Sequence, residues 1–101
     1  MSYEQAVDKI LQEVGVQVST IMKMPCLRYK GAFMAMMFEK EDCLIIKVSA
    51  ARVDELIAEG KGLEFNFTKK RFKEWVLIPS DFEDEYESYM YESLEYAKRK
   101  A

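Results

Sequence analysis

Residues 32–48 read AFMAMMFEKEDCLIIKV, and this stretch decides the fold. Two mostly apolar runs, Ala32–Phe38 and Cys43–Val48, flank the charged residues 39–42. Apolar runs of this length, separated by a short polar segment, are typical of two strands joined by a turn. The stretch therefore predicts an antiparallel hairpin in which Phe38 pairs with Cys43.

Side chains alternate along a strand, so this pairing divides the hairpin into two faces. One face is wholly apolar and predicts the core; it pairs Met37 with Leu44, Ala35 with Ile46, and Phe33 with Val48. The other face pairs Met36 with Ile45 and Met34 with Lys47. It is more apolar than a solvated sheet face normally is. We therefore predict an interface on that face, formed by Met34, Met36, Phe38, Ile45 and Lys47.

Five of the seven methionines lie in two stretches, IMKMPC at 21–26 and FMAMMF at 33–38. Soft sulfur ligands select Cu(I), but successive strand residues point to opposite faces and the chain has no histidine. We therefore predict no metal site. Methionine also fills irregular core space, and methionine-rich surfaces suit self-association or an adaptable pocket. The sequence leaves these two interpretations open.

The segments before and after the hairpin predict further elements. A helix over about residues 3–14 begins at a capping box of Ser2 and Gln5. Residues 20–29 predict a strand in which Pro25 indicates an edge or a bulge. Ser49 caps a helix over about residues 50–59, which Gly60 ends.

The last third of the chain predicts two strands and a helix. Residues 63–67 alternate as a half-buried strand does, and WVLIP at 75–79 is another strand. Ser80 and Glu83 form a second capping box, which begins the last helix. That helix presents one apolar stripe: Phe82, Tyr86, Tyr89, Met90, Leu94 and Ala97. The order α-β-β-β-α-β-β-α predicts a two-layer α+β fold, with one antiparallel five-stranded sheet and helices packed on one face.

Composition limits the class of protein. The 101 residues predict a single domain over 1–101, and a net charge of −3 gives no general attraction to phosphate. No apolar run approaches the ~20 residues that span a bilayer, and the N-terminus is not that of a signal peptide. We expect a cytoplasmic protein without a membrane partner. Cys26 and Cys43 lack paired spacing and predict buried thiols rather than a disulfide or a zinc site.

Neither a catalytic site nor a cofactor site is predicted. Without histidine, the cysteines and serines lack their usual base. The carboxylates between Asp81 and Glu95 predict a solvated face.

One basic run stands apart from this pattern. TKKRFKEW places Lys69, Lys70, Arg71 and Lys73 around Phe72, with Trp75 just beyond. Bases interleaved with an aromatic residue can bind phosphates while stacking on a nucleobase. The same run is also typical of a solvated loop between two strands, and both interpretations stay open.

Three segments together resemble the TfoX N-terminal domain family and, more loosely, the MmcQ/YjbR-like proteins. They are KMPCLRYKGAFMA at 23–35, IIKVSAARVDELIAEGKGLEF at 45–65 and KEWVLIP at 73–79. The most specific matches are single residues in a fixed order: Gly31, Phe33, Lys47, Val48, Arg52, Val53, Leu56, Gly60, Phe65, Trp75 and Val76. The sequence departs from the family where many members have Phe-Gly and this chain has Pro25 and Cys26.

The resemblance implies a bacterial protein with a small α+β domain and no agreed catalytic set. In the competence regulators that name the family, this domain precedes a C-terminal domain, and the pair acts in transcriptional control. The resemblance covers this first domain only, so the regulatory role is not carried over directly. Because the face of Met34, Met36, Phe38 and Ile45 is unusually apolar, we expect a non-enzymatic protein that binds a protein partner or itself, as a homodimer. The alternative is a nucleic-acid-associated regulatory accessory domain that uses residues 69–73.

Overall fold

The computed structural model describes residues 3–21 and 23–100. Within these residues the chain forms three α-helices and six strands: α1 (Tyr3–Ile10), β1 (Val16–Ile21), β2 (Met24–Tyr29), β3 (Ala32–Phe38), β4 (Cys43–Lys47), α2 (Ala50–Ala58), β5 (Leu63–Phe67), β6 (Lys70–Pro79) and α3 (Tyr86–Lys100). Short 3-10 helices, η1 (Glu39–Glu41) and η2 (Ser80–Glu85), precede β4 and α3. The fold class is α+β, as predicted.

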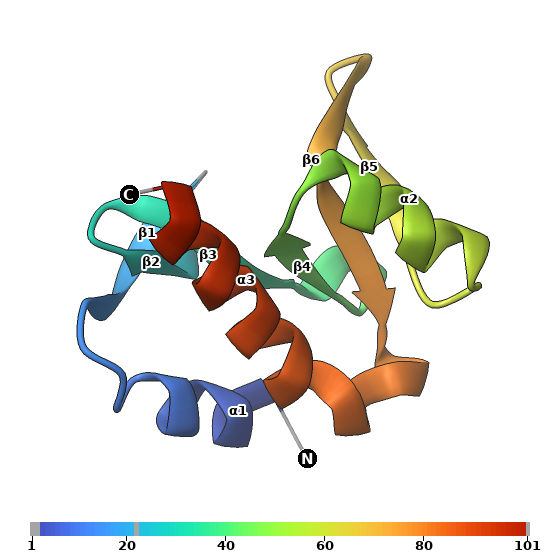
Figure 1. Cartoon of the computed structure of the whole chain (residues 1–101). Helices are drawn as coiled ribbons and strands as arrows, with labels where there is room; N and C mark the ends of the chain where they lie inside the picture. The colour runs from blue at the N-terminus through green and yellow to red at the C-terminus, as the bar shows by residue number, and fades with distance from the viewer. Residues whose placement is uncertain (1–2, 22, 101) are drawn as a thin grey trace.

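The described strands form one sheet in the order β1-β2-β3-β4-β6-β5, and every neighbouring pair is antiparallel. In Figure 1, α3 crosses one side of the sheet, and the β5–β6 hairpin extends beyond the other strands with α2 beside it. Phe38 pairs with Cys43 and Met36 with Ile45. The predicted register of the β3–β4 hairpin is therefore confirmed.

The predicted single strand over residues 20–29 is wrong, because the chain turns back on itself within that range. β1 ends at Ile21 and β2 begins at Met24. Lys23 adopts a φ of 66°, a left-handed conformation that closes a tight turn without glycine. Pro25 pairs with Thr20 near this turn, so it lies in a strand with neighbours on both sides. The sheet consequently has six described strands rather than five.

All three helices pack on the same face of the sheet, as predicted. Their buried side chains belong to one hydrophobic cluster: Ala6 and Ile10 from α1, Val53 and Leu56 from α2, and Tyr86, Tyr89, Met90, Leu94 and Ala97 from α3. The predicted stripe of the last helix is thus confirmed, with Phe82 partly buried against the same cluster.

The helix ends agree with the sequence at α2 and differ at α1. The Ser49 hydroxyl accepts the backbone N–H of Arg52 at 3.2 Å, and Gly60 has a φ of 78° after the helix, as predicted. α1 ends at Ile10 rather than near residue 14. After it, hydrogen bonds such as Glu13 N–H to the Ile10 carbonyl span three residues instead of four, so the α-helix does not continue. Ser2, the first residue of the predicted capping box, lies outside the described residues.

The predicted capping box of Ser80 and Glu83 is wrong. The Ser80 hydroxyl instead donates to the Asp42 carboxylate at 2.8 Å, and its N–H donates to the Asp42 carbonyl at 3.2 Å. These bonds hold Ser80, the first residue of η2, beside the β3–β4 turn. Phe82 has a φ of −107° and a ψ of 23°, which interrupts the helical conformation. α3 therefore starts only at Tyr86.

Candidate functional site

A β-bulge at Met34 redistributes the methionines between the two faces of the sheet. Leu27 pairs with Ala35, but the next residue, Arg28, pairs with Phe33, so Met34 is the extra residue. Met34 and Ala35 consequently both belong to the cluster under the helices. Phe33 and Met36 lie on the opposite face. The predicted pairing of Met34 with Lys47 on one open face is therefore wrong.

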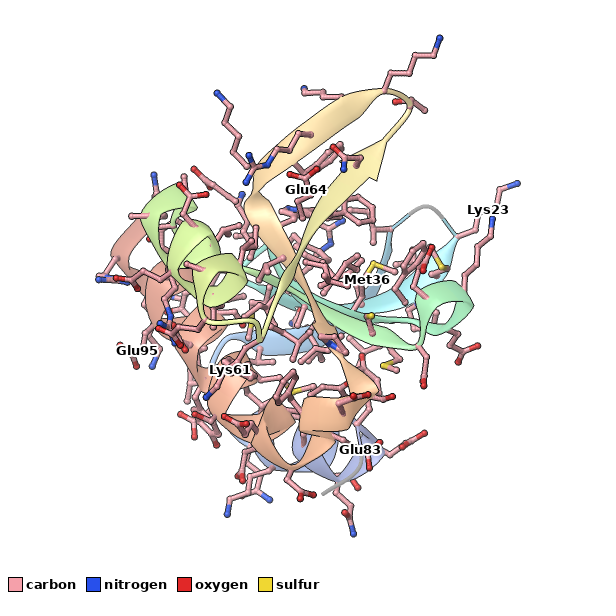
Figure 2. The ribbon with its side chains drawn as sticks, turned by 90° about the vertical axis from the view of Figure 1, so that its right-hand side faces the viewer. Lys23, Met36, Lys61, Glu64, Glu83 and Glu95 are labelled. Atoms are coloured by element: carbon pink, nitrogen blue, oxygen red, sulfur yellow. The ribbon has the colours of Figure 1, made fainter. Side chains whose placement is uncertain are left out.

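The face opposite the helices has a hydrophobic cluster of its own. Its buried members come from five strands: Cys26, Phe33, Met36, Cys43, Ile45, Phe65, Trp75 and Leu77. Met36 and Ile45 are 0% exposed. Figure 2 shows Met36 among the side chains between the strands. The predicted open face is thus covered by the chain itself.

A bulge of several residues in β6 places aromatic side chains over this face. Glu64 pairs with Val76, whereas Asn66 pairs with Arg71, so residues 72–75 of β6 lie opposite Phe65 alone. The extra length brings the rings of Phe72 and Trp75 to the same side. Phe65 contacts Phe72 edge-on at 5.4 Å between ring centroids and Trp75 at 5.3 Å.

The five residues predicted as an interface therefore separate. Met34 is buried under the helices, and Met36 and Ile45 are buried on the other side. Phe38 is half-buried, with its ring edge-on to Phe65 at 5.8 Å. Lys47 is half-buried, and its ammonium lies 4.0 Å from the Glu74 carboxylate.

Both cysteines are free and buried, as predicted. Burial raises the pKa of the Cys26 thiol. Burial also raises the pKa of the Cys43 thiol, and the nearby carboxylates of Glu41, Asp42 and Asp81 add to the effect. Neither thiol has the lowered pKa of a reactive nucleophile. Over the described part of the chain, no group of three or more His, Cys, Asp or Glu side chains is placed to hold a metal ion.

The basic run forms strand rather than loop. Thr68 and Lys69 make a two-residue turn, and β6 starts at Lys70. A hollow of about 340 Å³ lies along β6, lined by Lys47, Lys70, Arg71, Phe72, Lys73, Glu74 and Trp75. We call it the β6 hollow. The fold thus adds Lys47 to the predicted group, whereas Lys69 lies at the turn and does not line the hollow.

Arg71 is already engaged within the protein. Its guanidinium lies 3.3 Å from the Asp54 carboxylate on α2 and 3.4 Å from the Glu64 carboxylate on β5. Lys70 has no carboxylate partner among the described residues, and its ammonium lies over the ring of Phe72, 5.8 Å from the centroid. Within the described residues, the positive charge of the β6 hollow that no carboxylate pairs therefore comes from Lys70 and Lys73.

A second hollow, of about 310 Å³, lies near the start of α1. Its lining joins three carboxylates to apolar groups: Tyr3, Glu4, Pro25, Met37, Glu39 and Glu83. The three carboxylates are exposed, so they are solvated in the free protein.

β1 forms one edge of the sheet and bears no charged side chain, since residues 16–21 read VQVSTI. Natural edge strands are usually protected by lysine, proline or a bulge within the strand. Val18 on β1 is 59% exposed, and Val14 just before it is 87% exposed. Sequence reasoning missed this edge because it did not separate β1 from β2.

No family model, curated protein or solved structure matches the chain. Among the described helices, none has the length and apolar character needed to cross a membrane.

Proposed function

We propose that the chain is a non-enzymatic interaction module that pairs with a second copy of itself along β1. The observation that supports this most directly is that this edge strand bears no charged side chain of its own. Within the described residues β1 pairs with β2 only, so its other side has no strand beside it. A strand edge of this kind accepts another strand through backbone hydrogen bonds.

The backbone of Val18 is oriented for such pairing. The N–H of Lys30 donates to the Gly15 carbonyl at 3.0 Å, in register with the β1–β2 pairs. Hydrogen-bonded and non-hydrogen-bonded pairs alternate along an antiparallel ladder. The peptide groups of Val16, Val18 and Thr20 therefore point away from β2. Val18 thus offers both an exposed side chain and outward-facing backbone groups.

A two-fold axis at Val18 gives a self-complementary arrangement. Val18 then lies opposite Val18 of the second copy, and Val16 lies opposite Thr20. Directly opposed β-branched side chains stabilise a sheet, and this register keeps the helices of both copies on the same side. The other edge strand is less suitable, because β5 bears Glu64 and would bring like charges together.

Arg28 reinforces β1 without blocking this edge. Its guanidinium donates to the Ser19 hydroxyl at 3.2 Å and to the Thr20 carbonyl at 3.3 Å. A carbonyl oxygen accepts two hydrogen bonds, so the Thr20 oxygen keeps one acceptor position for a second copy.

The composition supports a binding role rather than a catalytic one. The chain has no histidine, and both thiols are buried with a raised pKa. Buried free thiols suit the reducing cytoplasm, where we propose that the protein acts. The resemblance to the TfoX N-terminal domain family agrees with this role, since that family brings no agreed catalytic set.

Sedimentation equilibrium from about 1 µM to 1 mM tests the proposal. We expect a reversible monomer–dimer equilibrium, which Val18→Lys shifts toward monomer by about tenfold or more in Kd. Val18→Pro should act similarly, because it removes an outward N–H and leaves the β1–β2 ladder intact.

Leu63→Lys is the matched control, since Leu63 is 54% exposed on the opposite edge. It should leave the equilibrium unchanged. A protein that stays monomeric at 1 mM contradicts self-association. A dimer that both Val18 variants leave intact contradicts the assignment to β1.

A further inference from the structure

The β6 hollow combines positive charge with an accessible aromatic ring in a protein whose net charge is −3. Its lining includes three lysines, Lys47, Lys70 and Lys73, against the single carboxylate of Glu74. Among the described residues, no carboxylate lies within 4.0 Å of the ammonium of Lys70 or Lys73. Within the described residues, two of the three lysines therefore have no carboxylate that competes with a bound anion.

Phe72 provides the aromatic part of the hollow. Its ring is half-buried and is held from beneath by Phe65 and Trp75, at centroid distances of 5.4 and 4.9 Å. The ammonium of Lys70 lies over the ring of Phe72. A planar group that displaced this ammonium would stack on a ring that is already fixed in place. Trp75 cannot serve in the same way, because one of its faces is stacked on Phe33 and the side chain is 8% exposed.

We infer that the β6 hollow binds a phosphate that carries a nucleobase, with the base on Phe72 and the phosphate between Lys70 and Lys73. Stacking on an aromatic residue beside basic side chains is how proteins bind single strands without reading their sequence. An inorganic anion would use only the lysines. A duplex would keep its bases inside the stack and away from Phe72. A single-stranded oligonucleotide and a free nucleotide both offer a phosphate together with a nucleobase that can stack on Phe72.

This site is independent of the proposed pairing along β1. β1 is at one edge of the sheet, and β6 is separated from it by β2, β3 and β4. Loss of one function would therefore leave the other measurable.

The experiment uses Trp75, the only tryptophan of the chain, as a reporter inside the hollow. The full chain is titrated at 20 mM salt with a ten-residue oligothymidylate, thymidine monophosphate, pyrophosphate and a blunt duplex. Binding is followed by Trp75 fluorescence and by anisotropy of labelled oligonucleotide. We expect the oligothymidylate to bind and to change the Trp75 emission.

Two variants test the contacts separately. Lys70→Ala/Lys73→Ala should weaken oligothymidylate binding by at least tenfold and flatten its salt dependence, since fewer counterions are released. Phe72→Leu keeps an apolar side chain under the base and should weaken binding about tenfold without changing the salt dependence. Lys23→Ala/Lys40→Ala removes the same charge from exposed positions outside the hollow and should bind normally. Circular dichroism of each variant checks the fold.

The outcomes separate the sources of the ligand. Tighter binding of the oligothymidylate than of the monophosphate supports a single strand, and equal binding supports a free nucleotide. Pyrophosphate or the duplex binding as tightly as the oligothymidylate overturns the role of the base. Absence of binding by every probe, or equal loss in the Lys23→Ala/Lys40→Ala control, overturns the site.

Discussion

The indole ring of Trp75 is stacked on the phenyl ring of Phe33, with ring centroids 4.4 Å apart and ring planes 20° from parallel. The contact joins β6 to β3 across β4, on the face away from the helices. Aromatic pairs of this kind contribute about 0.5–1.5 kcal/mol beyond the burial of their area. The pair therefore helps to hold together the hydrophobic cluster on that face.

Phe33→Ala should lower the free energy of unfolding by about 3–5 kcal/mol, because it leaves a cavity against Trp75. Urea denaturation followed by Trp75 fluorescence measures the loss. Val14→Ala is the control, since Val14 is 87% exposed and its truncation should change stability by less than about 0.5 kcal/mol. A loss at Phe33 no larger than that of the control would show that the second cluster is not packed as described.

Met36→Lys should prevent stable folding at neutral pH. The side chain is fully buried among apolar groups, so an ammonium there loses its hydration without gaining a partner, at a cost of about 3 kcal/mol or more. Thermal denaturation followed by circular dichroism measures the effect. Leu63→Lys introduces the same group at an exposed position and should unfold near the wild-type temperature. A folded and soluble Met36→Lys variant would instead support the open face that the sequence predicted.

Stability should fall at alkaline pH because of Tyr86. Burial raises the pKa of the Tyr86 hydroxyl from 10.0 to about 12, and this hydroxyl donates to the Ile78 carbonyl at 3.2 Å. The native state holds the proton more tightly than the unfolded chain does. Its contribution is therefore complete below pH 10 and is lost as the pH rises through 12. The rise in pKa from 10.0 to about 12 corresponds to roughly 3 kcal/mol in the free energy of unfolding.

Urea midpoints measured between pH 9 and 12 test this contribution. Tyr86→Phe should lower stability at pH 7 by about 1 kcal/mol, through the lost hydrogen bond, and should then decline less steeply with pH. A residual slope is expected, because burial also raises the pKa of Tyr3 and of Tyr89. Identical slopes for the variant and the wild type would contradict the assignment to Tyr86.

The turn between β5 and β6 should be open to stabilisation. Thr68 and Lys69 have φ values of 51° and 65°. This left-handed backbone conformation is strained for most residues and is adopted most readily by glycine and asparagine. Thr68→Asn/Lys69→Gly should raise stability by about 1 kcal/mol, or Tm by about 4–8 °C. Gly31→Ala, at the turn before β3 where φ is 91°, should lower Tm instead. A Tm unchanged by the Asn-Gly turn would mean that residues 68–69 are not strained.

The sequence predicted the β3–β4 hairpin well because both of its determinants are local. The polar segment between Phe38 and Cys43 fixes where the chain turns, and alternation then fixes which residues pair. Alternation within β3 could not predict the bulge at Met34, because the bulge arises from the pairing of β3 with β2. The β1–β2 turn was missed because Lys23 adopts its left-handed conformation without a glycine or asparagine.

The candidate sites were only partly predictable for the same reason. The sequence places Lys70 and Lys73 near Phe72, and the structure keeps them together. It could not show that Lys47 joins them, or that Arg71 is neutralised by Asp54, because the sheet and α2 create both contacts. The lack of charged side chains in VQVSTI indicates an open edge only if residues 16–21 form a separate edge strand, which the structure shows.

β4 lies between two hydrophobic clusters, so the chain shields this strand from water on both sides. Residues 43–46 are all buried, and their neighbours in β3 and β6 pair with them on either side. Their amide hydrogens can exchange with deuterated solvent only when the whole domain opens. The outward amide of Val18 should exchange within the earliest time points, and a second copy on β1 would slow it. One deuterium-exchange profile therefore reports the global free energy of unfolding at β4 and the occupancy of the sheet edge at β1.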